Sequence, residues 1–131
     1  MSPDLKYLLL STILCFVQVV IAASGANQQV GLSTLAGNRE GLPDIVGWSG
    51  RARRAHLNMI ENLVLFAALV LIAAVAGKAN ATTAMGAMIF FWARLAYAVI
   101  YLIGIPWLRT LAWFVSVIGI VMIAWALLQA I

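Results

Sequence analysis

Four long apolar stretches constrain the fold of this chain more than any other feature of its sequence. They cover about residues 5–23, 49–76, 82–103 and 107–128 of the 131 residues. A helix that crosses a bilayer needs about 20 apolar residues, so each stretch is long enough. With 65% hydrophobic and 9% charged residues, the composition is also typical of membrane proteins. We therefore expect an all-α integral membrane protein whose single domain, 1–131, is a four-transmembrane-helix bundle.

The first stretch also admits an interpretation as a signal peptide. Lys6 precedes its apolar run, and the small residues Ala22, Ala23 and Ser24 follow the run as a cleavage site would. Two observations favour a spanning helix instead. Asp4 offsets the positive charge near the N-terminus, and the apolar run is long for a signal peptide.

Residues 24–47 form the only long polar stretch of the chain. Its glycines and Pro43 predict an irregular loop, although its first part can extend the preceding helix. We expect Asp44 or Ser49 to cap the helix that follows, and Gly77 to end that helix.

Lysine and arginine are divided unevenly between the two sides of the predicted bundle. One side carries Arg39, Arg51, Arg53, Arg54 and Arg109, and the other carries Lys6 and Lys78. Because positive residues stay in the cytosol, this distribution predicts arginine-rich cytosolic loops and both termini outside the cytosol. The net charge of +4 is thereby explained without nucleic acid, for which no suitable basic surface is predicted.

The second stretch begins with a polar stripe. Steps of 3, 4, 3 and 4 place Arg51, Arg54, Asn58, Glu61 and Leu65 on one helical face. Ionisable residues inside a membrane segment indicate function. Guanidinium groups bind carboxylates and a glutamate binds ammonium, so the stripe predicts a site for a small zwitterionic ligand. A polar seam between packed helices is the alternative interpretation.

The third stretch carries a second polar face. Arg94, Tyr97 and Tyr101 follow at steps of 3 and 4. An arginine at this depth needs a counter-charge, and Glu61 is the acidic residue placed inside a span. We expect Arg94 and Glu61 to meet, directly or through a ligand. A purely structural ion pair, and tyrosines that only anchor the helix at the interface, are the alternatives.

Other classes of site fit the sequence poorly. The single histidine, His56, lies five positions from Glu61, off its helical face, so no metal site is expected. Cys15 is alone in an apolar stretch, and neither it nor a serine has a base motif. Small multidrug exporters carry their key glutamate in the first helix without surrounding arginines. Here Glu61 lies in the second helix, between Arg54 and further polar residues.

The sequence resembles the MAPEG superfamily, membrane-associated proteins in eicosanoid and glutathione metabolism. The most specific match is RAHLNMIEN at residues 54–62. GNRE at 37–40, FWARLAY at 91–97 and GIPWLR at 104–109 support it. The resemblance covers nearly the whole chain and is greatest to the short bacterial branch, similar to microsomal glutathione transferases.

The resemblance implies a homotrimer that binds glutathione, as a co-substrate, between subunits near the cytosolic face. The positions that match the ligand-binding residues of the family are Arg51, Arg54, Asn58, Glu61, Tyr97 and Tyr101, with Arg94 beside them. Arg109 is nearest to the family's thiol-activating arginine, although the segment around Pro106 shifts the register. Asn62 stands where eicosanoid enzymes carry an aromatic residue, which argues against leukotriene-type substrates.

The resemblance thus implies a glutathione transferase or peroxidase, with Arg109 and Tyr101 as catalytic residues. Its second substrate would be a hydrophobic electrophile or a lipid hydroperoxide that arrives from the membrane lipids. A nearby guanidinium lowers the pKa of a thiol and favours the thiolate that such chemistry needs. A non-catalytic scaffold that binds lipids or partners is the alternative. The expected location is the bacterial inner membrane.

Overall fold

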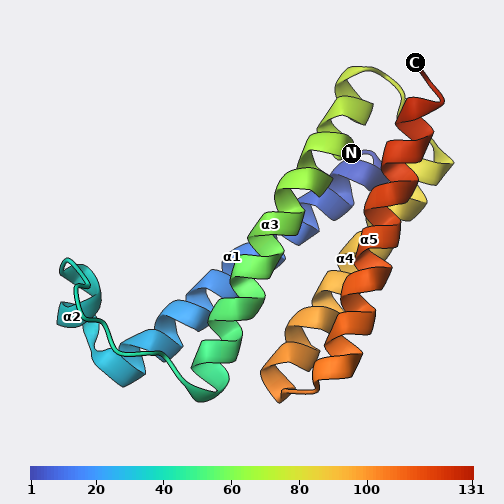
Figure 1. Cartoon of the computed structure of the whole chain (residues 1–131). Helices are drawn as coiled ribbons and strands as arrows, with labels where there is room; N and C mark the ends of the chain where they lie inside the picture. Colours follow the sequence, from blue (N-terminus) through green and yellow to red (C-terminus); the bar gives the residue numbers. More distant parts are fainter.

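The computed structural model describes all residues from Met1 to Ile131 and is entirely helical, without strands. Its helices are α1 (Pro3–Val30), α2 (Leu32–Ala36), α3 (Gly47–Val75), α4 (Ala81–Ile103) and α5 (Pro106–Leu128), as Figure 1 shows. Four of them, α1, α3, α4 and α5, are long and apolar enough to cross a membrane. The predicted all-α fold with four spanning helices is confirmed.

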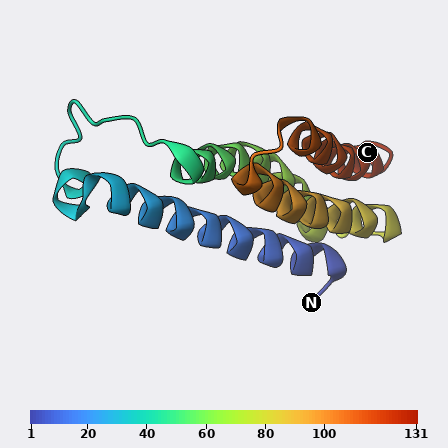
Figure 2. The same cartoon turned by 90° about the horizontal axis from the view of Figure 1, so that it is seen from below.

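The helices form a bundle with one projecting arm. α1 packs against α3 and α4, and α5 packs against α4 and α3, whereas α1 and α5 do not pack on each other. Figure 2 shows α3 and α4 between these two outer helices. The segment with α2 extends away from one end of the bundle, and both termini lie toward the other end (Figure 1). The end that carries the arm is also the end where the candidate site lies.

α1 continues past residue 23 to Val30, so the first part of the polar stretch extends this helix, as the sequence allows. The extension packs on the start of α3. Gly25 lies so close to Ser49 that a Cβ atom on Gly25 would clash with the Ser49 Oγ. This packing stabilises the helix beyond the predicted end, and Gly31, with φ +85°, terminates it. Part of the predicted loop is therefore helical, and so is the short α2.

The predicted side-chain caps of α3 are wrong. Neither Asp44 nor Ser49 caps this helix, because its N-cap residue is Val46. In place of a side-chain cap, the side chain of Gln29 in α1 forms hydrogen bonds with the backbone of Val46. Its Nε2 donates to the Val46 carbonyl at 2.7 Å, and its Oε1 accepts from the Val46 N–H at 3.0 Å. These two bonds fasten the returning loop to the end of α1.

Close helix contacts and a small aromatic core hold the bundle together. Phe66 of α3 stacks on Phe90 of α4 with ring centroids 4.0 Å apart, inside a fully buried apolar cluster. α4 and α5 approach each other at Gly86 and Gly119, where a Cβ on Gly86 would lie 2.6 Å from the Gly119 carbonyl oxygen. Small residues permit such approaches between membrane helices. Large apolar side chains cover the outer faces and contact lipid.

Candidate functional site

A polar cluster lies where α3, α4 and α5 meet, near the end of the bundle that carries the arm. Three residues of the polar stripe reach α4 from α3. Arg51 Nε donates to the Leu102 carbonyl at 3.1 Å, and Arg54 Nε donates to the Tyr101 hydroxyl at 3.1 Å. Asn58 Oδ1 accepts from Arg94 Nη2 at 2.8 Å. The face that the spacing predicts is therefore the face that packs against α4.

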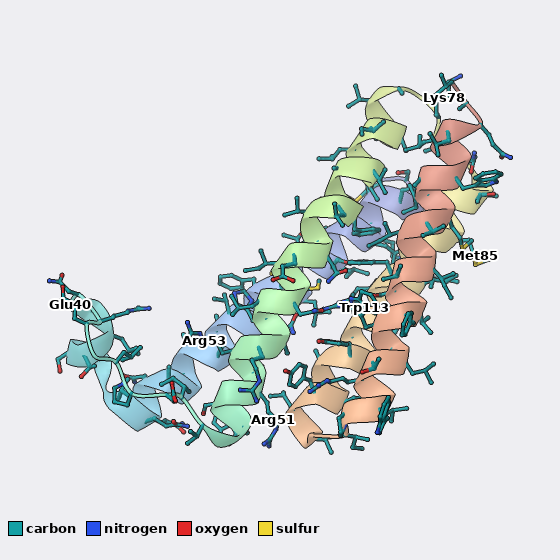
Figure 3. The ribbon with its side chains drawn as sticks, viewed as in Figure 1. Glu40, Arg51, Arg53, Lys78, Met85 and Trp113 are labelled. Carbon is teal, nitrogen blue, oxygen red and sulfur yellow. The ribbon has the colours of Figure 1, made fainter.

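Figure 3 shows how the arginines at the start of α3 diverge. Arg51 lies on the side of the helix toward α4, and Arg53 lies on the side turned away from it. Lys78 lies at the opposite end of the bundle in the same view. The arginines of the chain are thus concentrated at the end where the polar cluster lies.

Tyrosine rings and guanidinium groups alternate inside the cluster. Tyr97 and Tyr101 are buried and meet edge to face, with centroids 5.6 Å apart. The Arg94 guanidinium lies 4.2 Å from the Tyr97 ring centroid, and the Arg109 guanidinium lies 4.4 Å from that of Tyr101. Arg54 approaches the same Tyr101 ring at 5.9 Å. Cation–π attraction of this kind holds guanidinium groups beside the rings without neutralising their charge.

Arg109 joins the cluster although the segment around Pro106 separates it from the helix that carries the tyrosines. Gly104, with φ +92°, turns the chain after α4, and Pro106 opens α5 immediately afterwards. The turn is short enough to bring the first turn of α5 back onto Tyr101. Arg109 therefore lies beside Tyr101, the residue with which the resemblance to the MAPEG superfamily groups it.

A hollow of about 230 Å³ opens beside the cluster. Its lining residues are Asn58, Tyr97, Arg109, Thr110 and Trp113. Three predicted site residues thus face one cavity, from α3, α4 and α5. Thr110 and Trp113 were not predicted as site residues. The spacing of four residues between Arg109 and Trp113, which places both on one helical face, is the signal that identifies Trp113.

Glu61 does not meet Arg94, so the predicted direct contact is wrong. Glu61 is exposed, and the bond of Arg94 goes to Asn58 instead. Asn62 takes the inward position. It is buried, and its Nδ2 donates to the Asn58 carbonyl at 2.8 Å and to Asn58 Oδ1 at 3.3 Å. Two amide side chains thus occupy the face of α3 that points at Arg94, and the carboxylate lies to the side.

Arg94 is the most deeply buried charge in the chain, with 1% of its surface exposed. Its Nε and Nη1 have no hydrogen-bond partner, and only Nη2 is bound, by the Asn58 amide. An arginine stays protonated inside proteins, so its positive charge is not removed by burial. A buried charge without a counter-ion is unfavourable. The cluster therefore carries unbalanced positive charge beside a hollow, which favours an anionic ligand.

Comparison with known proteins identifies the family of the chain. The MAPEG family model matches residues 6–129, a stretch that includes the polar cluster. No curated protein and no solved structure matches the chain.

Proposed function

The chain belongs to the MAPEG family of membrane proteins in glutathione or eicosanoid metabolism, and from this premise we propose that it binds glutathione beside α3, α4 and α5. The bound thiol would be activated for attack on apolar substrates from the bilayer. The observation that carries the proposal is the convergence of Arg54, Arg94 and Arg109 on two buried tyrosines, next to a hollow.

The charges of the cluster complement those of glutathione. This tripeptide carries two carboxylates, one ammonium group and one thiol. In the proposed orientation, Arg51 and Arg54 lie at the cytosolic end of the bundle and can bind the carboxylates through charged hydrogen bonds. The exposed carboxylate of Glu61 can bind the ammonium group, and the Asn58 amide can bind the peptide backbone.

Tyr101 and Arg109 are the groups that we assign to the thiol. The Tyr101 oxygen accepts a hydrogen bond from Arg54, so its own proton can be donated to the glutathione sulfur. The Arg109 guanidinium lies over the same ring and adds positive charge where the thiolate forms. Both effects favour the thiolate over the thiol. The thiolate sulfur then bonds to an electrophilic carbon as its leaving group departs. With a hydroperoxide, two glutathione molecules are oxidised to the disulfide and the products are an alcohol and water.

The proposed site is completed by a second copy of the chain. Ligand pockets usually measure about 300–1,000 Å³, and the hollow here is about 230 Å³. Glu61 is exposed in one chain. A homotrimer, in which each site lies between two subunits, would enlarge the pocket and cover this carboxylate. We place this assembly in the bacterial inner membrane, with the arginine-rich end in the cytosol.

Calorimetric titration of glutathione into detergent-purified protein tests the proposal, with Arg54→Ala as the site variant and Arg53→Ala as its matched control. Arg53 is the adjacent arginine, on the side of α3 away from α4. We expect binding to wild type and to Arg53→Ala, and a loss of about tenfold or more for Arg54→Ala. Thermal melting checks that each variant is folded. Absence of binding to folded wild type would refute the proposal, whereas binding without turnover of electrophiles or hydroperoxides would favour the non-catalytic scaffold.

A further inference from the structure

A second cavity lies between α1, α3 and α4, whereas the polar cluster lies between α3, α4 and α5. It measures about 170 Å³, and nine of the ten residues that line it are hydrophobic. Its volume results from small side chains, because Ala52 and Ala55 of α3 and Ala98 of α4 lie at its walls. Alanines at these positions leave space that larger apolar residues would fill.

Gln18 is the single polar residue among those that line the cavity. Its side chain is 7% exposed, and its Oε1 has no hydrogen-bond partner. A buried amide without a partner is unfavourable, and more so at the depth of the hydrocarbon, where water is absent. A spanning helix gains nothing from such a group unless something binds it. The cavity thus has one buried amide, with an unpartnered oxygen, in the wall of an otherwise apolar space.

The cavity opens toward the bilayer. Val17 of α1 and Val99 of α4 belong to its lining, and they are 45% and 51% exposed. Both lie on the outer faces of their helices in the single chain, and we infer that these faces contact lipid. A molecule dissolved in the hydrocarbon can therefore reach Gln18 by passing between α1 and α4.

The cavity is separate from the polar cluster. Ala55 lines the cavity and packs against Tyr97 and Tyr101 in one buried group. Ala98 follows Tyr97 in α4 and is likewise buried. A molecule in the cavity is therefore separated from the hollow beside Arg109 by the wall that contains Ala55, and the glutathione thiol would not reach it.

We propose that this cavity binds a small aromatic alcohol, a molecule the size of phenol, which donates its hydroxyl to Gln18 and places its ring among the alanines. Size and chemistry both lead to this class. A dry apolar cavity of about 150 Å³ is sufficient to bind benzene. One ring with one hydroxyl group fits the available volume and satisfies the single buried acceptor. The site is independent of glutathione, so its test does not depend on the function proposed above.

Fluorine NMR on the protein in lipid nanodiscs tests the site, with 4-fluorophenol and fluorobenzene as probes and unlabelled phenol as competitor. Empty nanodiscs measure partition into the lipid. We expect saturable binding of 4-fluorophenol that phenol displaces. After correction for partition into the lipid, wild type should bind 4-fluorophenol about fivefold to tenfold more tightly than fluorobenzene, because one buried hydrogen bond contributes about this much.

Four variants separate the contributions to binding. Gln18→Leu keeps the volume but removes the acceptor, and should bind both probes with equal strength. Ala98→Leu fills the cavity and should abolish saturable binding of both, with Val99→Phe at the rim as a second filling variant if thermal melting shows the first to be unfolded. Val19→Leu, on the lipid-facing side of α1, should behave as wild type.

The outcomes that overturn the proposal are equally specific. A wild-type protein without saturable, phenol-displaced binding has no such site. A Gln18→Leu variant that keeps the preference for the phenol excludes Gln18 as the acceptor. Persistent binding in a folded filling variant places the probe elsewhere on the protein.

Discussion

Arg94 of α4 donates a 2.8 Å hydrogen bond to the side chain of Asn58 of α3, and this bond is the single polar partner of a buried guanidinium group. It joins the two helices that contribute most of the predicted site residues. The stripe on α3 and the face on α4 are therefore connected in the depth of the bundle, as well as at Arg54 and Tyr101.

Asn58→Ala should destabilise the protein, because it removes the single hydrogen-bond partner of the buried Arg94 guanidinium. Loss of a hydrogen bond to a buried charged donor costs about 1–3 kcal/mol. Thermal unfolding in detergent measures the effect. Asn58→Asp is the matched control, since its carboxylate would supply the missing counter-charge and should raise the melting temperature above that of Asn58→Ala. Equal melting of Asn58→Ala and wild type would show that the bond contributes nothing.

Glu61→Gln should leave the stability of the chain unchanged, because the carboxylate is exposed and does not contact Arg94. Exposed substitutions of this kind usually change stability by less than about 0.5 kcal/mol. Glutathione binding should nonetheless weaken by about tenfold or more, because the ammonium group loses a charged hydrogen bond. Melting and calorimetry on the same sample separate the two effects. A large loss of stability with unchanged affinity would mean that Glu61 is a structural residue of the assembly.

The sequence predicts the inner face of α3 only in part, and Glu61 and Asn62 show why. Helical spacing is local geometry, so steps of three and four residues are enough to place Arg51, Arg54 and Asn58 on one side of the helix. Adjacent residues at the edge of that face are about 100° apart on an α-helix, and spacing cannot decide which of them turns inward. Tertiary packing decides it: Asn62 is buried in the bundle, and Glu61 is left exposed.

The spanning helices were predictable because their length and hydrophobicity are properties of contiguous sequence. The length of the α1 extension was not, because it depends on the contact of Gly25 with Ser49, two residues far apart in the chain. The same reason applies to the clamp between Gln29 and Val46. Trp113 was overlooked because an aromatic residue in an apolar helix normally contacts lipid, and only the position of Arg109 over Tyr101 shows that this face of α5 turns inward.

Tyr101→Phe should separate binding from thiol activation. The variant keeps the ring on which Arg109 lies but removes the hydroxyl that accepts from Arg54. We expect glutathione affinity to fall by less than about tenfold, the value of one hydrogen bond. Turnover of an electrophile should fall by about 100-fold or more, the usual cost of one donor to a developing charge. Ultraviolet absorbance of the bound thiolate reports the cause directly. An undiminished thiolate signal in Tyr101→Phe would assign activation to another group.

Gly86→Ala should separate α4 from α5 and disturb the site at their far end. A Cβ at position 86 would lie 2.6 Å from the Gly119 carbonyl oxygen and 2.9 Å from an Ile123 side-chain carbon. The oxygen belongs to the backbone, so one helix must move, and overpacking of this kind costs about 1–3 kcal/mol. Gly37→Ala is the matched control, because its added Cβ would find its nearest atoms at 3.5 and 3.6 Å, ordinary contact distances. Thermal melting should separate the two variants.

The displaced α5 should also carry Arg109 away from Tyr101, so Gly86→Ala should weaken glutathione binding while Gly37→Ala retains it. Equal melting of both variants would mean that α4 and α5 adjust without strain at this contact.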